Sequence, residues 1–221
     1  MTRTRLKVCC IGSRDEARLA VDHGADALGL VSAMPSGPGV VDEAVIADVT
    51  AWAPPPVATF LLTSRRDAAG IAGQLDRTAA STAQLVDAVP AAELAALRAA
   101  RPATRLVQVI HVLDEASVDE ARAALPLVHA LLLDSGNPRL AVKELGGTGR
   151  VHDWALSRRI RDEASAAGVP VFLAGGLRAE NVAAAVRAVR PFGVDVCSGV
   201  RSGGRLDAGK LATFAAQLSS A

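Results

Sequence analysis

Short apolar runs alternate with longer segments of helical period along the whole chain, and this alternation restricts the possible folds more than any other feature. Eight runs rich in Val, Ile and Leu are typical of strands. They cover residues 6–12, 25–31, 56–63, 82–86, 105–112, 129–135, 170–176 and 193–199. Several of the Ala-rich segments between them begin at Ser, Asp or Pro and end at Gly. We expect helices over residues 13–24, 42–53, 90–101, 117–126, 153–168 and 178–190, and a weaker one over 65–79.

Alternating strands and helices require a parallel sheet with the helices outside it. Strands without charged alternation are buried on both faces. Eight such units in 221 residues fit an α/β fold, a single (β/α)8 TIM barrel over residues 1–221. A doubly wound open sheet is the alternative. It would be unusually wide, and its G-x-G-x-x-G signature is missing because residues 9–17 contain one glycine.

Composition excludes several kinds of partner. The 24 Lys and Arg residues nearly balance 23 Asp and Glu, so no strong field attracts nucleic acid or an anionic membrane. Aromatic residues make up 3% of the chain, too few for base-stacking surfaces. No run is long enough for a signal peptide or a membrane span, and no cluster suggests a metal. We expect a cytoplasmic monomer or homodimer that binds a small phosphorylated molecule.

Three cysteines are too few for a disulfide framework, and an odd number cannot all pair within the chain. Cys9 and Cys10 are adjacent in the first strand, so strand geometry predicts that they point to opposite faces and that at most one faces the barrel mouth. Most buried thiols are inert packing residues. The strand pattern alone leaves open which of the two, if either, takes part in chemistry.

Substrates of this fold bind at the carboxyl ends of the strands. These ends carry small or polar residues: Cys9 and Cys10, Asp134, Gly175 and Gly176, and Ser198 and Gly199. Glycines there let backbone N–H groups approach a phosphate closely, although they could serve turn geometry alone. Asp134 follows three leucines, so burial should raise its pKa toward that of a general acid. A loop-fixing aspartate is the alternative.

The connection over residues 136–150 is longer than most strand-to-helix loops, and such loops often bind ligands. Its sequence GGTGR, with Gly147 and Gly149, resembles a phosphate cradle but lacks the Gly-Lys-Ser/Thr end of a P-loop. A flexible connection is an equally open interpretation.

Several blocks together resemble the phosphoribosylanthranilate isomerase family of tryptophan biosynthesis. They are KVCCIG, GADALGLV, LLLDS followed by GGTGRVHDW, VPVFLAGGLRAENVAAAV and PFGVDVCSGV, in the family's order and spacing. The resemblance covers the whole chain and is strongest from Asp134 to Val200. It implies a (β/α)8 enzyme that performs an Amadori rearrangement, an intramolecular aldose-to-ketose isomerisation, without a cofactor.

The resemblance also implies residue roles. Cys9 matches the general base and Asp134 the general acid, which together open the furanose ring and remove the C2′ proton. Cys9 would therefore face the mouth and Cys10 the helices. Lys7 could lower the pKa of the Cys9 thiol, or only stabilise the barrel interior. The phosphate would lie against four residues of the last two strand ends: Gly175, Gly176, Ser198 and Gly199.

The chain departs from the family pattern mainly where the aglycone should bind. The departures are Pro38 in place of an arginine, Val86 and Asp87 in place of His-Gly, Cys10 in place of glycine, and Arg201 in place of a glutamate. The arginine could be replaced by a cation elsewhere on the rim: Arg65, Arg66, Arg139, Lys143 or Arg150. The leading hypothesis is a phosphoribosylanthranilate isomerase. The alternatives are a diverged paralogue for another phosphosugar and a non-catalytic phosphate-binding barrel, and retention of Cys9 and Asp134 argues against the second of these.

Overall fold

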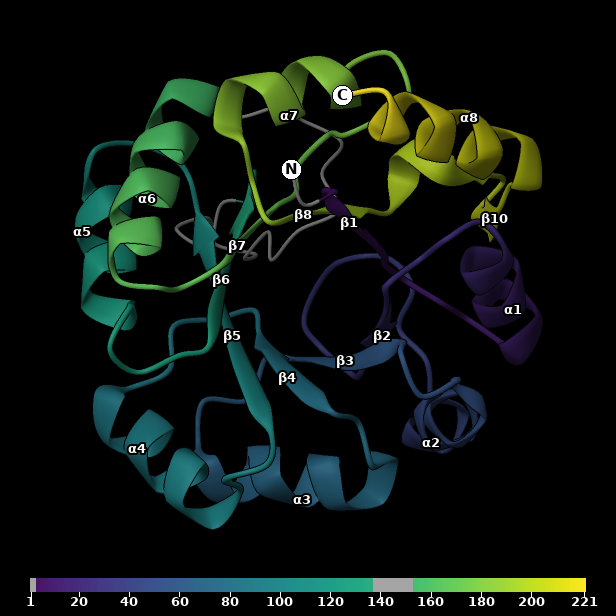
Figure 1. The fold of residues 1–221 in the computed structure, drawn as a ribbon. Coiled ribbons are helices and arrows are strands. Elements are labelled where there is room, and N and C mark those ends of the chain that lie inside the picture. The colour runs from purple at the N-terminus through teal and green to yellow at the C-terminus, as the bar shows by residue number, and fades with distance from the viewer. Residues whose placement is uncertain (1–2, 137–152) are drawn as a thin grey trace.

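The computed structural model describes residues 3–136 and 153–221. Eight parallel strands close into a barrel in chain order, with β8 paired to β1 and helices forming an outer ring (Figure 1). The strands are β1 (Arg5–Val8), β2 (Ala27–Val31), β3 (Ala58–Thr63), β4 (Thr82–Leu85), β5 (Arg105–His111), β6 (Ala130–Asp134), β7 (Val171–Leu173) and β8 (Gly193–Val196). The helices between them are α1 (Arg14–Asp22), α2 (Glu43–Trp52), α3 (Ala68–Thr78), α4 (Ala91–Ala100), α5 (Ala116–Ala124), α6 (Trp154–Ala166) and α7 (Val182–Val189). The predicted barrel is confirmed.

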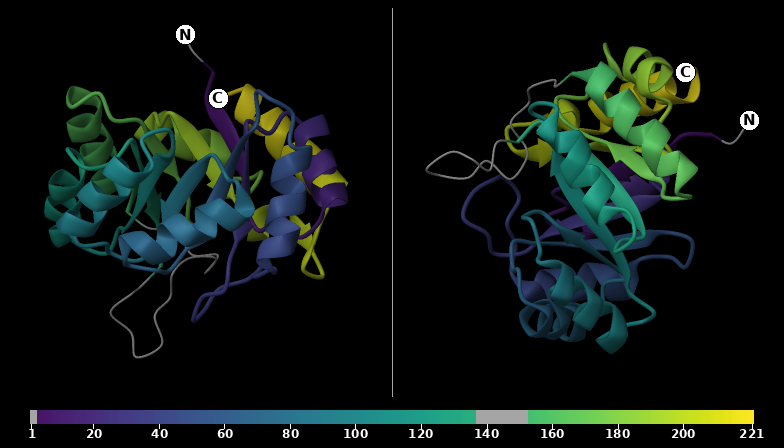
Figure 2. Two further views of the ribbon diagram at one scale, coloured as in Figure 1. Left: turned by 90° about the horizontal axis from the view of Figure 1, so that it is seen from below. Right: turned by 90° about the vertical axis from the view of Figure 1, so that its left-hand side faces the viewer.

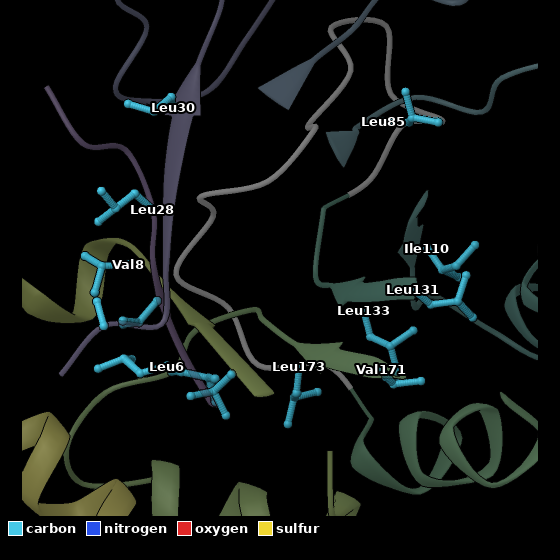
Figure 3. Close-up of a cluster of buried hydrophobic side chains, with 14 of the residues drawn as sticks. Leu6, Val8, Leu28, Leu30, Leu85, Ile110, Leu131, Leu133, Val171 and Leu173 are labelled. Carbon is cyan, nitrogen blue, oxygen red and sulfur yellow. The ribbon is translucent and has the colours of Figure 1, made fainter. Parts of the chain in front are cut away.

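Two apolar shells follow from the alternation of side chains along the strands. Leu6 and Val8 of β1 belong to the larger shell, between strands and helices, whereas Lys7 between them faces the barrel interior. Figure 3 shows this larger shell, with leucine, isoleucine and valine side chains from β1, β2, β4, β5, β6 and β7. The smaller shell fills the barrel, where Phe60 and Phe172 meet edge to face with ring centroids 5.8 Å apart. Burying one such apolar side chain contributes roughly 1.5–3 kcal/mol.

The chain continues past β8 with elements that the sequence analysis did not assign. A 3₁₀ turn, η1 (Ser198–Val200), leads into a short hairpin of β9 (Arg201–Ser202) and β10 (Arg205–Leu206). Helix α8 (Ala208–Ser219) follows, and the Asp207 side chain caps it by accepting from the Lys210 N–H at 3.0 Å. The apolar face of α8 completes the helical ring beside β1.

The less certain helix α3 does form. Asp67 accepts from the N–H of Gly70 at 2.6 Å, so an N-cap offsets part of the cost of glycine in the first turn. The first strand is shorter than predicted: β1 ends at Val8, and the following residues have left the strand before the predicted end at residue 12.

The carboxyl ends of the strands meet at one rim. Figure 2 shows the segment after β2, residues 32–42, and the β9–β10 hairpin extending from the end of the barrel opposite the N-terminus. The loops that can contribute to a site are therefore gathered at that end. In the part of the chain that the structure describes, no helix is both long and apolar enough to cross a membrane.

Candidate active site

A cavity opens at the carboxyl ends of the strands. Its walls include five of the residues predicted from the sequence: Cys9, Asp134, Gly175, Gly176 and Ser198. Apolar side chains of the inner shell also line it, so water reaches only part of the cavity. Four strand ends thus supply residues to one concave site, the arrangement that is typical of barrel enzymes.

Lys7 and Asp195 form a buried ion pair beneath this cavity. The register of β1 and β8 sets them opposite each other, and Lys7 Nζ donates to Asp195 Oδ1 at 2.8 Å. The ammonium also lies 5.3 Å from the centroid of the Phe60 ring. Burial disfavours the ammonium, but the Asp195 carboxylate and the Cys9 thiol outweigh burial and raise the pKa of Lys7. Lys7 therefore stays cationic, and both roles foreseen for it are compatible with this geometry.

Cys9 lies in the cavity wall beside Lys7. Its N–H donates to the Val196 carbonyl at 2.8 Å, which fixes the backbone just past the end of β1. A Cβ added at Gly29 would stand 2.8 Å from Cys9 Sγ and 2.9 Å from Lys7 Nζ. Glycine at position 29 therefore provides the space in which thiol and ammonium come together.

The prediction that Cys10 points toward the helices is wrong. Cys10 has φ of 63°, in the left-handed region that non-glycine residues seldom adopt, and this turn interrupts the alternation of the strand. As a result both Cys9 and Cys10 line the cavity, while Ile11 packs into the outer shell. Cys10 Sγ lies 3.6 Å from the Pro38 carbonyl oxygen and 2.8 Å from Cys197 Sγ.

Asp134 ends β6 with its carboxyl group facing into the barrel. The side chain is 7% exposed, and Oδ1 accepts from the Ser135 N–H at 2.8 Å. Burial raises the pKa of Asp134, and the Ser135 N–H and nearby His111 and Lys7 offset only part of that effect. The predicted direction of this shift is confirmed.

The phosphate candidates divide into two groups. Gly175 and Gly176 line the cavity with φ of 80° and 62°, and within the described residues their backbone N–H groups make no backbone hydrogen bond. Ser198 lines the same cavity. Gly199 is outside this cavity, and a Cβ there would stand 2.0 Å from the Leu177 carbonyl oxygen, so close packing of the loops after β7 and β8 requires glycine. Gly147 and Gly149 lie outside the described residues.

Arg201 links the end of β1 to the β9–β10 hairpin. Its Nη2 donates to the carbonyl oxygens of Cys9 and Cys10 at 3.2 and 2.5 Å, and to Glu16 Oε2 at 3.1 Å. Glu16 in turn accepts from the N–H groups of Gly12 and Leu206 at 3.0 and 2.8 Å. Burial favours the protonated carboxyl group, but Arg201 and these N–H donors outweigh burial and lower the pKa of Glu16. Arg201, which stands where the family pattern has a glutamate, therefore holds the loop that carries Cys9 and Cys10 in place.

Comparison with known proteins agrees with this geometry. Residues 6–217 match the family model described as N-(5'phosphoribosyl)anthranilate (PRA) isomerase. The chain belongs to this family. It is 34% identical over 212 residues to N-(5'-phosphoribosyl)anthranilate isomerase 2 of Methanosarcina mazei, with 95% of this chain and 92% of the relative covered. The Haloferax volcanii isomerase is 40% identical over 205 residues, covering 91% and 86%. The solved phosphoribosyl anthranilate isomerase from Thermotoga maritima superposes with a TM-score of 0.83 at 26% identity, covering 99% of this chain and 100% of that one.

This member of the PRA isomerase family has no described cation on the aglycone side of its cavity. Pro38 and Gly37 line the wall where the family pattern has its arginine, and Val86 is buried in the inner shell. Arg66 donates to the Ala88 carbonyl at 2.7 Å, and neither Arg65 nor Arg66 lines the cavity. The other cations considered, Arg139, Lys143 and Arg150, lie outside the described residues.

Sequence reasoning missed three residues of this PRA isomerase-family site: Gln84, Asp195 and Cys197. All of them line the cavity. Asp195 had a usable signal, because a single aspartate between the valines of β8 stands level with Lys7 once the barrel closes. Gln84 had a similar signal: it stands between Ala83 and Leu85, whose side chains face outward, so its own side chain must face the barrel interior. Among the residues described, no group of three or more His, Cys, Asp or Glu side chains could hold a metal ion.

Proposed function

We propose that this chain converts N-(5'-phosphoribosyl)anthranilate into its ketose isomer by acid–base catalysis, as a cytoplasmic enzyme acting on a small phosphosugar. The observation that carries the proposal is the convergence of Cys9 and Asp134 on one cavity that Gly175, Gly176 and Ser198 also line. Family membership supports the same substrate, because the curated relatives bear its name.

The acid in this scheme is Asp134. Because burial raises its pKa, Asp134 can hold a proton and donate it to the furanose ring oxygen. The C1′–O bond then breaks, and the nitrogen lone pair forms an iminium ion at C1′. The apolar surroundings favour the neutral carboxyl group, which carries the proton that this step consumes.

The base in this scheme is Cys9. Its thiolate removes the C2′ proton, the electron pair of that C–H bond neutralises the iminium nitrogen, and the enolamine that results tautomerises to the ketone. The Lys7 ammonium lies beside Cys9, so a positive charge faces the proposed base. Lys7 therefore acts on the base through its charge. Its hydrogen bond to Asp195 keeps the ammonium in place.

The phosphate in this scheme lies against Gly175, Gly176 and Ser198. Among the described residues, the N–H groups of Gly175 and Gly176 donate to no backbone carbonyl, so they are suited to an anion, and glycine allows close approach. Gly199 would contribute by holding the loop after β8 against Leu177.

A second candidate is isomerisation of a phosphosugar with an uncharged aglycone. Pro38 and Gly37 favour it, because they line the aglycone side without a charged group. Losing a charged hydrogen-bond partner costs on the order of 2–3 kcal/mol of binding, so the two substrates should differ clearly in KM.

The test follows the fluorescence of phosphoribosylanthranilate as it is consumed by the wild type, Cys9→Ala and Asp134→Asn. We expect turnover by the wild type and a loss of about 10²–10⁴-fold in kcat in each variant. Asp48→Asn, on the exposed side of α2, is the matched carboxylate control and should keep wild-type rates. Wild-type activity in Cys9→Ala would remove Cys9 as the base. Absence of turnover by the wild type, with binding of simple sugar phosphates, would favour the second candidate.

A further inference from the structure

Two thiols that the proposed isomerase reaction does not use lie against each other at the cavity mouth. Cys10 follows β1 and Cys197 follows β8, and their Sγ atoms are 2.8 Å apart, closer than unbonded sulfur atoms ordinarily approach. Both cysteines are free, and both line the cavity. The contact follows from the left-handed turn at Cys10, which brings its side chain round to the β8 side instead of toward the helices.

The surroundings give the two thiols different reactivity. Cys197 is only half-buried, whereas Cys10 is buried. The hydrogen bond with Cys10 and the positive charge of Arg201 outweigh burial and lower the pKa of Cys197. The hydrogen bonds with Cys197 and Cys9, together with burial, raise the pKa of Cys10. A half-buried thiol of lowered pKa in contact with a buried thiol is the arrangement found in thiol pairs that respond to oxidants.

We propose that Cys197 and Cys10 form a reversible disulfide when the protein meets a hydroperoxide, with Cys197 as the site of attack and Cys10 as the resolving thiol. The inference is independent of the proposed isomerase function, since neither residue is assigned to proton transfer.

The chemistry balances with hydrogen peroxide as the oxidant. The Cys197 thiolate attacks one peroxide oxygen, the O–O bond breaks, and the departing hydroxide takes a proton and leaves as water. Cys197 is then a sulfenic acid, oxidised by two electrons. Cys10 sulfur attacks the Cys197 sulfur, the S–O bond breaks, and the Cys10 proton accompanies the hydroxide as a second water. Two thiols and one peroxide become one disulfide and two waters.

Cys9 is placed outside this pair. It is 5% exposed and lies against Lys7 and Gly29. The next residue in the chain, Cys10, is the one whose sulfur contacts Cys197, the residue that follows β8. The disulfide therefore leaves one free thiol in the chain, and that thiol is Cys9.

The experiment treats the reduced full-length protein with hydrogen peroxide at one to a few equivalents and maps the peptides by mass spectrometry without reduction. We expect a Cys10–Cys197 cross-linked peptide, Cys9 still alkylated by iodoacetamide, and full recovery of three free thiols with dithiothreitol. The protein should remain a single chain on a non-reducing gel. The oxidised form should also melt several degrees higher, because the bond encloses most of the chain and limits the unfolded state.

Two variants are suited to this test: Cys10→Gly introduces the residue of the family pattern, and Cys197→Ser exchanges only sulfur for oxygen. Cys10→Gly, which accepts the left-handed backbone, should stop at a Cys197 sulfenic acid that dimedone traps. Cys197→Ser should form no cross-link and no dimedone adduct at Cys10. A Cys9–Cys10 cross-link in the wild type, first oxidation at Cys9, or cross-links only between chains would each overturn the proposal. The wild-type peptide map decides it even if a variant folds poorly.

Discussion

At the scale of single residues, Asp134 combines the proposed catalytic function with a cost in stability. Burial favours its neutral form in the folded state, so its folded pKa is raised above that of the unfolded chain. Between the two pKa values the folded state binds more protons. Its contribution to stability is therefore complete below the unfolded pKa and is lost as pH rises through the folded pKa. Asp134 therefore makes the fold less stable at neutral pH than at low pH.

This sign predicts that Asp134→Asn is more stable than the wild type at neutral pH, by on the order of 1 kcal/mol or more, because the amide keeps the shape without the charge. Urea unfolding from pH 7 to pH 4 measures it. The advantage of the variant should shrink as pH falls, since both proteins are then neutral at this position. A variant that is less stable at every pH would contradict the assigned direction. The same variant should lack turnover, which would separate stability from activity at one position.

At the scale of elements, the Arg201–Glu16 link holds the loop after β1 to the hairpin after β8. Both side chains are mostly buried, 10% and 19% exposed, and one guanidinium donates to two backbone carbonyls and a carboxylate. Without it, the backbone of Cys9 and Cys10 loses two of its fixed contacts. Arg201 is thus a positioning residue for the proposed base.

We expect Arg201→Met to lower kcat about 10-fold or more with a smaller change in KM, since a displaced base slows proton transfer more than binding. Arg201→Lys should restore little of the lost kcat, because a single ammonium cannot reproduce the forked hydrogen bonds of the guanidinium. Steady-state kinetics with phosphoribosylanthranilate measures both. Arg14→Met, which breaks an exposed ion pair with Asp48, is the matched control and should have wild-type kinetics. Equal losses in kcat in both variants would indicate a general effect on folding.

The elements also show how far the sequence could be interpreted. Apolar runs located every strand of the barrel, because a strand buried on both faces must be apolar almost throughout. They could not show that Cys10 turns into the left-handed region, since that conformation depends on the close packing of Gly39 and Pro38 against it. Helix α8 was left unassigned although Asp207 provides an N-cap. The contacts of Arg201 with Glu16 join residues 185 positions apart, which no local pattern encodes.

At the scale of the whole molecule, the Lys7–Asp195 pair joins the first and last strands where the barrel closes. Both groups are buried, 0% and 9% exposed, so each depends on the other for compensation of its charge. Removing one partner leaves an isolated buried charge and should cost about 3–5 kcal/mol, whereas replacing both with apolar residues should be close to neutral. The interior of the barrel thus tolerates loss of the pair better than loss of one member.

We predict that Lys7→Met and Asp195→Asn each lower the free energy of unfolding by several kcal/mol, and that Lys7→Met combined with Asp195→Val recovers most of it. Chemical denaturation of the single and double variants measures the coupling. Arg3→Met, which breaks an exposed pair with Asp26 before β1, should cost less than about 1 kcal/mol. The recovered double variant should nevertheless remain inactive on phosphoribosylanthranilate, because it lacks the ammonium beside Cys9. Additive losses in stability would show that the pair does not act as a unit, and activity in the double variant would show that Cys9 needs no neighbouring positive charge. A double variant that is stable but inactive would mean that the charge at the seam serves the chemistry of the cavity and not the closure of the barrel, because an apolar pair closes the barrel as well.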